Sequence, residues 1–211
     1  MLEASSTIIR VLTVDDHALF RTGIATLVGY ESDMELVAEA TTGSEAIDEF
    51  RKHRPDITLM DLQMPGMSGI DAITAIREEF PQARIVVLTT YSGDVQVMRA
   101  FQAGAQGYLL KGLLRKDLLE TIRAVHAGKK RVPPEVAAQI AENAAGDSLS
   151  SREIEVLRLI GGGNANKEIA AQLSVTEDTV KSHVRSILAK LGANDRTHAV
   201  TIGLKRGIID L

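Results

Sequence analysis

The first 128 residues alternate five times between a short apolar run and a longer amphipathic segment, and no other feature of the sequence restricts the fold as strongly. The apolar runs are four to eight residues long and rich in β-branched side chains: Thr7–Val14, Glu35–Ala40, Asp56–Met60, Ala83–Thr89 and Gly107–Leu110. Such runs predict β-strands, and the nearly continuous apolar character of most of them indicates strands that are buried on both faces.

Each strand-like run is followed by a segment whose apolar residues recur at helical spacing. These five segments are Ala18–Tyr30, Ser44–His53, Ser68–Phe80, Val95–Ala103 and Arg115–Ala127. Five consecutive strand–helix units with right-handed crossovers form a doubly wound parallel sheet. We therefore predict an α/β fold, a flavodoxin-like (βα)5 unit, over residues 7–128.

The pattern changes after Gly128. Residues 129–148 contain a basic triplet, a Pro-Pro pair and an Ala-rich stretch, which predict a linker that is partly helical from Pro134 to Ala144. Residues 149–211 show only helical spacing, with a capping-box pair at Ser150 and Glu153. An all-α domain of four helices is expected there, over Ser150–Ile160, Asn166–Leu173, Glu177–Leu191 and Asp195–Arg206.

Composition excludes several classes of protein. At 211 residues, 45% hydrophobic and 25% charged, the chain has the composition of a soluble protein of one or two domains. The absence of cysteine excludes disulfides, thiolate zinc sites, iron–sulfur clusters and cysteine nucleophiles. Aromatic residues make up only 3%, which argues against base-stacking platforms and an aromatic ligand pocket. Because no apolar run suits a membrane span or a signal peptide, we expect a cytoplasmic protein.

Charge is distributed unevenly along the chain. The first 146 residues carry 15 basic and 20 acidic residues, whereas the last 65 carry nine and eight. The C-terminal domain is therefore not strongly basic. If it binds nucleic acid, its basic side chains must be concentrated on one face.

Polar residues follow four of the predicted strands, and together they are Asp15, Asp16, Asp61, Thr89 and Lys111. The carboxyl ends of parallel strands lie at one edge of a sheet, where ligands bind. Three carboxylates repel one another unless a cation lies among them. The chain has no cysteine, and we count no histidine near these carboxylates, so all ligands would be oxygen atoms. Such a donor set favours Mg²⁺ or Mn²⁺.

Such a cluster has a definite chemistry. A carboxylate beside a divalent ion and a lysine can attack phosphorus and hold the product as an acyl phosphate. Lys111 and the Thr89 hydroxyl would then stabilise the phosphoryl oxygens. A single Asp at a strand end is more often a helix N-cap than a ligand, but five polar residues at strand ends favour a functional site.

Four segments around these residues resemble the receiver domain of two-component response regulators: VLTVDDHALFRTGI, ITLMDLQMPGMSGID, IVVLTTYS and GAQGYLLKG. Two further segments, LSSREIEVLRLI and NKEIAAQLSVTEDTVKSHVRSILAKLGANDRTHAV, resemble the LuxR-type helix-turn-helix. Over nearly the whole chain the sequence is thus similar to the NarL/FixJ family of bacterial transcription regulators. The resemblance is specific, because two independent modules match in the family's order.

The resemblance implies that Asp61 is the phosphoacceptor. It also implies that Mg²⁺ is held by the carboxylates of Asp15, Asp16 and Asp61 and by the backbone carbonyl of Gln63. A local change of charge at Asp61 would then shift the domain between two states.

The resemblance further implies a switch pair, Thr89 and Tyr108, with Lys111 beside the phosphoryl group. Lys111 would contact the phosphoryl group, Thr89 would move toward it, and Tyr108 would turn inward. Many receivers follow the lysine with a cis proline, whereas here Gly112 follows Lys111. A non-proline cis bond costs about 3 kcal/mol, so the geometry of this peptide bond is open.

The segment Glu177–Leu191 is expected to be a DNA-recognition helix, with an apolar stripe inward and polar residues toward its N-terminal half. The expected DNA contacts are Asn166, Lys167, Thr179, Lys181, Ser182, His183 and Arg185. His183 is equally compatible with packing. A solvated polar face is the alternative, and the preceding short helix with the tight Ser174-Val175 turn favours DNA binding.

The leading hypothesis is a transcription regulator, not an enzyme, that a sensor histidine kinase phosphorylates. Phosphorylation would promote a homodimer, in part through Ala199 and Ile202, that binds double-stranded DNA half-sites and acts on RNA polymerase without membrane association. One alternative is a Mg²⁺-dependent phosphatase, although such enzymes usually show Asp-x-Asp where this chain has Asp15-Asp16-His17. Others are a metabolite-gated LuxR-type regulator and an adaptor without DNA binding.

Overall fold

The computed structural model describes residues 8–90, 93–112, 115–132, 134, 137–138 and 148–209. The contacts between residues divide the chain into two compact units. Residues 1–90 and 97–134 form the first, here called the sheet unit, and residues 91–96 and 135–211 form the second, here called the helical unit.

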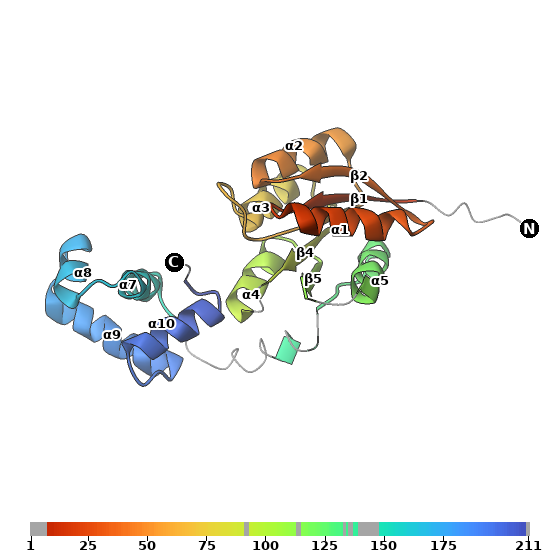
Figure 1. Cartoon of the computed structure of the whole chain (residues 1–211). Helices are drawn as coiled ribbons and strands as arrows, with labels where there is room; N and C mark the ends of the chain where they lie inside the picture. The colour runs from red at the N-terminus through yellow and green to blue at the C-terminus, as the bar shows by residue number, and fades with distance from the viewer. Residues whose placement is uncertain are drawn as a thin grey trace, which may run out of the picture. The chain divides into compact units, whose positions relative to one another are not determined.

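The sheet unit contains one sheet of five parallel strands in the order β2-β1-β3-β4-β5 (Figure 1). The strands are β1 Ile9–Val14, β2 Met34–Ala40, β3 Ile57–Met60, β4 Ile85–Thr89 and β5 Gly107–Leu110. The strand order changes direction at β1, which lies between β2 and β3. The predicted doubly wound parallel sheet is confirmed, and its switch point lies between β1 and β3.

Five helices accompany these strands: α1 Ala18–Gly29, α2 Gly43–His53, α3 Gly69–Glu79, α4 Asp94–Gln102 and α5 Arg115–His126. Two of them begin at a hydroxyl cap. The Thr42 side chain accepts a hydrogen bond from the Glu45 amide, and the Ser68 side chain accepts one from the Asp71 amide. These caps satisfy amides that have no partner within the helix.

The burial of the strands follows their sequences. Every residue of β3 and β4 is buried, as their apolar runs predict, whereas the edge strand β2 is buried only at Met34 and Ala40. One apolar cluster joins α1 and α5 to a face of the sheet through Ile9, Val11, Ile24, Val28, Met34, Ile57, Leu59, Val86, Leu88, Leu109, Leu118, Leu119, Ile122 and Val125. Because neighbouring strands pair in parallel, their carboxyl ends form one edge of the sheet.

The helical unit contains the four predicted helices, α7 Ser151–Gly161, α8 Asn166–Gln172, α9 Glu177–Leu191 and α10 Arg196–Lys205 (Figure 1). The predicted capping box is present, because Ser150 and Glu153 each accept a hydrogen bond from the other's backbone amide. Val156, Leu157, Ile169, Val180 and Ile187 are among its fully buried core residues. The expectation that Ala199 pairs with a second copy is wrong, since it is buried in this core.

The peptide bond between Lys111 and Gly112, which the sequence left open, is trans, since the described residues contain no cis bond. The helix expected between Pro134 and Ala144 lies mostly outside the described residues. Within the described part of the chain, no helix combines the length and the apolar character that crossing a membrane requires.

Candidate functional site

Two buried carboxylates meet at the switch point of the sheet. Asp15 directly follows β1, Asp61 directly follows β3, and these strands pair with each other. Both residues are almost fully buried, at 1% and 3% exposure. Backbone hydrogen bonds from the Asp15 amide to Ala40 and from the Asp61 amide to Val14 hold the two strand ends in register. The sequence-based expectation that these residues converge is confirmed.

Lys111 joins the two carboxylates. Its Nζ lies 2.6 Å from Oδ2 of Asp15 and 2.6 Å from Oδ2 of Asp61. Its amide donates to the Thr89 carbonyl at 2.7 Å, which ties the residue after β5 to the end of β4. The ammonium also lies 4.8 Å from the centre of the Phe20 ring. Lys111 therefore neutralises part of the negative charge of two carboxylates that are buried away from water.

The environment shifts the pKa values of both partners in the Asp61–Lys111 pair. Burial raises the pKa of Asp61, and the hydrogen bond and positive charge of Lys111 only partly oppose this effect. Burial by itself would lower the pKa of Lys111, but hydrogen bonds to Asp15 and Asp61 outweigh it and raise the pKa. The lysine is thus charged at neutral pH. Perturbed groups that converge in this way are typical of functional sites.

The donor set beside Lys111 fits a divalent cation. Asp15, Asp16, His17 and Asp61 each offer one ligand atom, and these atoms all lie within 4.8 Å of one another. Three carboxylates and one ammonium leave two negative charges, which a divalent ion balances. The amide of Gln63 donates to Oδ1 of Asp61 at 3.3 Å, so the backbone of Gln63 borders the site.

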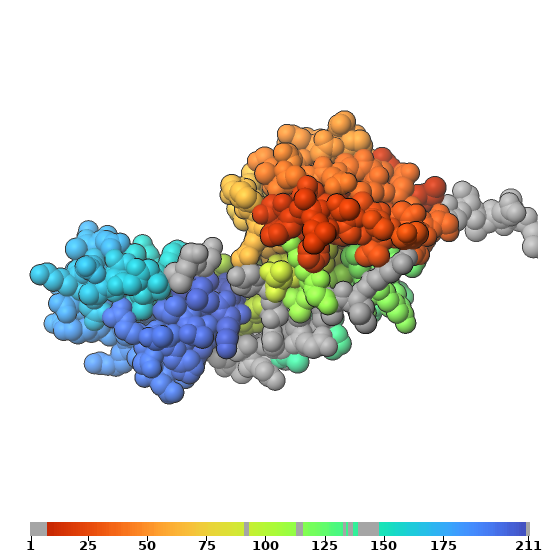
Figure 2. All heavy atoms as spheres, viewed as in Figure 1, coloured from red at the N-terminus to blue at the C-terminus, as the bar shows by residue number. Residues whose placement is uncertain are grey.

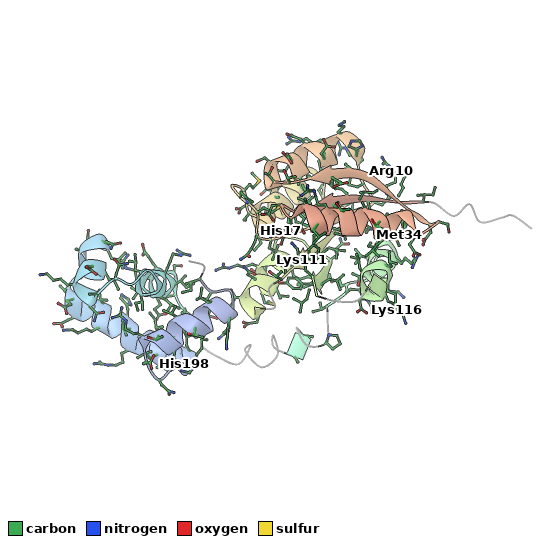
Figure 3. The ribbon with its side chains drawn as sticks, viewed as in Figure 1. Arg10, His17, Met34, Lys111, Lys116 and His198 are labelled. Carbon is green, nitrogen blue, oxygen red and sulfur yellow. The ribbon has the colours of Figure 1, made fainter. Side chains whose placement is uncertain are left out.

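His17 corrects one expectation. Sequence reasoning counted no histidine near the carboxylates, yet the ring nitrogen Nδ1 of His17 lies 2.7 Å from Oδ1 of Asp16. Figure 3 shows His17 and Lys111 at the same end of the sheet unit. The signal was present in the sequence, because His17 directly follows Asp15 and Asp16.

The two expected switch residues lie inside the sheet unit. Thr89, the last residue of β4, and Tyr108, the second residue of β5, are fully buried in these paired strands. Burial, helped by the negative charge of Asp61, raises the pKa of Tyr108.

Two residues that sequence reasoning did not single out shape the carboxylate site. A Cβ on Gly69 would overlap the carbonyl oxygen of Asp61, so only glycine fits there without displacing the loop after β3. The Arg21 guanidinium donates to the Asp15 carbonyl at 2.6 Å and fixes the end of β1. The sequence did hold a signal for Gly69, because glycine is a poor helix former and this one directly follows the Ser68 cap.

The helical unit presents an exposed polar face on α9. Val180 and Ile187 point into the core, whereas Lys181, Ser182 and Arg185 are exposed. Arg185 follows Ser182 by three residues and Lys181 by four, spacings that place side chains on the same side of a helix. In the view of Figure 2, atoms of α8, α9 and α10 form much of the surface of the helical unit.

The turn between α8 and α9 is tight. Ser174 has a φ of 54°, a left-handed conformation that reverses the chain within a few residues. Thr176 then caps α9, and its side chain accepts from the Thr179 amide at 3.1 Å. The hydroxyls of Thr176 and Thr179 lie 2.8 Å apart. The arrangement is that of a helix-turn-helix whose second helix is α9.

The remaining residues predicted to contact DNA differ in exposure. Lys167 is exposed, whereas Asn166 and His183 are half-buried. Oδ1 of Asn166 is buried and has no hydrogen-bond partner among the described residues. Lys181 pairs with Asp178 at 3.1 Å and with Glu177 at 3.8 Å on the same helix.

A buried ionic network that the sequence did not reveal joins α7 to α9. The Glu153 carboxylate accepts from Oγ of Ser186 at 2.6 Å and from Nζ of Lys190 at 2.8 Å, in addition to its bond with the Ser150 amide. Burial by itself would raise the pKa of Glu153, but these hydrogen bonds outweigh it and lower the pKa to about 2. The network fixes the position of α9 against α7.

A sheet unit with a buried carboxylate–lysine site, joined to a helical unit with an exposed recognition helix, defines a regulator that couples a receiver to a DNA-binding module. Comparison with protein families supports this class: the response regulator receiver domain matches residues 11–123, and the luxR family of bacterial regulatory proteins matches residues 147–202. The chain belongs to the LuxR-type response regulators, the NarL/FixJ family that its sequence resembles.

Individual relatives cover both parts of the chain. The response regulator protein VraR of Staphylococcus aureus is 38% identical over 206 residues, which are 95% of this chain and 99% of VraR. A LuxR-family two-component response regulator from Aurantimonas sp. SI85-9A1 is 37% identical with a TM-score of 0.63, over 65% of this chain and 99% of that chain.

A DNA-bound relative has also been solved. RcsB from Salmonella enterica serovar Typhimurium, bound to a promoter in the presence of the phosphomimetic BeF3⁻, is 29% identical with a TM-score of 0.73. The match covers 94% of this chain and 98% of that chain. This protein is therefore a response regulator with receiver and LuxR-type DNA-binding domains, and the phosphatase-like alternative is not favoured.

Proposed function

We propose that this response regulator accepts a phosphoryl group on Asp61 with the help of Mg²⁺. The observation that carries the proposal is Lys111, whose Nζ lies 2.6 Å from both Asp15 and Asp61 at the switch point of the sheet. Asp15, Asp16, Asp61 and the backbone carbonyl of Gln63 are the proposed ligands of the ion. When bound, Mg²⁺ supplies positive charge that polarises the phosphoryl group.

The residues of the site then have distinct roles in the transfer. A carboxylate oxygen of Asp61 forms a bond to phosphorus, and the bond from phosphorus to the imidazole nitrogen of the kinase breaks as that nitrogen takes the electron pair. Lys111 offsets the negative charge of the phosphoryl oxygens, and the Thr89 hydroxyl donates to one of them. Tyr108 is the buried partner of Thr89 in the resulting switch.

The helical unit supplies the output. We assign residues 7–128 to the receiver, 129–148 to a linker and 149–211 to the DNA-binding domain, with α9 in the major groove. The proposed DNA contacts are Asn166, Lys167, Thr179, Lys181, Ser182, His183 and Arg185. Because Lys181 pairs with Asp178 in the free protein, it exchanges this partner for DNA on binding.

The partners follow from this assignment. A sensor histidine kinase supplies the phosphoryl group, and a phosphorylated homodimer binds two half-sites on double-stranded DNA in the cytoplasm and acts on RNA polymerase. One recognition helix reads only a few base pairs, so a two-fold dimer extends the site that is read. The promoter-bound RcsB structure obtained with BeF3⁻ supports DNA binding by proteins of this kind.

Phosphorylation of the full chain with acetyl phosphate tests the proposal. Mass spectrometry should detect one Mg²⁺-dependent adduct that Asp61→Ala removes and that the exposed control Asp48→Ala retains. An adduct of undiminished amount on Asp61→Ala would sink the assignment. Sedimentation with BeF3⁻ should show a dimer, and an unchanged monomer with normal DNA binding would contradict the dimer.

A further inference from the structure

His17 is a polar side chain at the cation site to which the proposed function gives no role. It is the N-cap residue of α1, yet its side chain makes no capping hydrogen bond. Its Nδ1 instead lies 2.7 Å from Oδ1 of Asp16 and 3.3 Å from Oδ1 of Asp15. Its amide donates to the same Asp15 oxygen at 2.9 Å, which holds the residue against the site.

We propose that His17 is a fourth protein ligand of this site, used by divalent transition-metal ions and not by Mg²⁺. The inference rests on the proposed function only in placing the cation among Asp15, Asp16 and Asp61. The inference adds that His17 determines which divalent ions the site prefers, because its imidazole binds transition-metal ions and does not bind Mg²⁺.

The geometry suits a single ion. An ion with ligand distances of about 2.1 Å holds its donors no more than about 4.2 Å apart, and the four donor atoms lie within 4.8 Å of one another. The widest pair of donors must therefore move about 0.6 Å closer together. The side chains of Asp16 and His17, 29% and 67% exposed, are free to make this adjustment, whereas Asp15 and Asp61 are buried and held by Lys111.

The chemistry of the donors decides which ions use His17. Mg²⁺ is a hard ion that takes oxygen ligands and keeps several waters, so a water replaces the imidazole in its coordination sphere. An imidazole nitrogen suits Ni²⁺, Cu²⁺ and Zn²⁺, and affinity rises from Mn²⁺ to Ni²⁺ along the first row. Loss of the ring should thus weaken Ni²⁺ binding and leave Mg²⁺ binding nearly unchanged.

Calorimetric titration of the full-length, tag-free protein with MgCl2, MnCl2 and NiCl2 tests this selectivity. His17→Ala should lower the Ni²⁺ affinity about tenfold or more and change the Mg²⁺ affinity by less than about twofold. The exposed His198 in the helical unit provides the matched control, since His198→Ala should leave Ni²⁺ binding to this site unchanged. Equal Ni²⁺ affinity in wild type and His17→Ala would overturn the inference.

A spectroscopic signature separates a direct ligand from a residue that only positions Asp16. Electron spin echo measurements on the Cu²⁺-bound protein should show coupling to the ¹⁴N nuclei of a coordinated imidazole in the wild type and none in His17→Ala. Coupling that persists in the variant, or is absent from the wild type, would also refute the inference. Failure of Mg²⁺-dependent labelling of Asp61 would instead refute the proposed function, while the Ni²⁺ comparison would still decide the role of His17.

Discussion

The buried carboxylate of Glu153 should contribute a large part of the stability of the helical unit. It is only 4% exposed and accepts hydrogen bonds from the Ser150 amide, Ser186 and Lys190. Replacing it in Glu153→Gln removes the negative charge while it keeps the shape of the side chain. The Lys190 ammonium then loses its charged partner next to the core.

The size of the effect follows from the pKa of Glu153. Its decrease from 4.5 to about 2 corresponds to about 3 kcal/mol of folding free energy, since one pKa unit equals about 1.4 kcal/mol. We expect Glu153→Gln to lower the free energy of unfolding of this unit by about 2–3 kcal/mol near neutral pH. For a domain of this size the melting temperature should fall by about 10 °C or more.

The stabilisation has a defined pH dependence. Because the pKa of the folded state lies below that of the unfolded state, the contribution is fully present above pH 4.5. It is lost as the pH falls from 4.5 toward 2, when the folded state takes up the proton. The difference in stability between wild type and Glu153→Gln should therefore be constant from pH 5 to 7 and shrink below pH 4.5.

Hydrogen exchange of the amides in α7 and α9 measures this stability within the full chain. The exposed Glu155, which pairs with Arg152 at 2.7 Å on the same helix, gives the matched control Glu155→Gln, and this change should cost less than about 1 kcal/mol. Two results would refute the reasoning: wild-type protection in Glu153→Gln at pH 7, or a loss of the same size at pH 3 and pH 7.

Four further changes test other parts of the molecule. Gly69→Ala should slow phosphorylation of Asp61 by acetyl phosphate about tenfold or more, because the new Cβ displaces the Asp61 carbonyl. Mass spectrometry measures the phosphorylation rate. A wild-type rate in the variant would show that the loop adjusts without moving the Asp61 carboxylate. Lys181→Ala should cost about 1–3 kcal/mol on a specific duplex alone, whereas Arg185→Ala should reduce the salt dependence of binding by about one counterion on any duplex. Affinities for specific and scrambled duplexes at several salt concentrations check both, and if both variants bind like wild type, α9 is a structural helix. Arg123 donates to Glu31 and Asp33 at 2.7 Å from a partly exposed position. Arg123→Ala should lower the free energy of unfolding, measured with denaturant, by about 1 kcal/mol or less, because solvent screens exposed ion pairs. A loss of several kcal/mol would contradict this screening.

Much of the fold could be predicted because its signals are local. The alternation between strand and helix periods, the Ser150–Glu153 capping box and the Asp195 cap each involve residues a few positions apart. The meeting of Asp15 with Asp61 could also be predicted, since parallel strands place their carboxyl ends at one edge. These features depend on the order of the elements and not on details of side-chain packing.

The contacts that give the site its chemistry depend on packing. Lys111 reaches Asp61 across 50 residues of chain, and its choice of both carboxylates follows from the exact separation of β1, β3 and β5. Gly69 and Lys190 escaped prediction for the same reason, since each acts on a residue of another element. The pattern of residue types specifies which elements form and in what order. Only the packed structure brings side chains of distant elements within bonding distance, because these distances are set when the elements pack together.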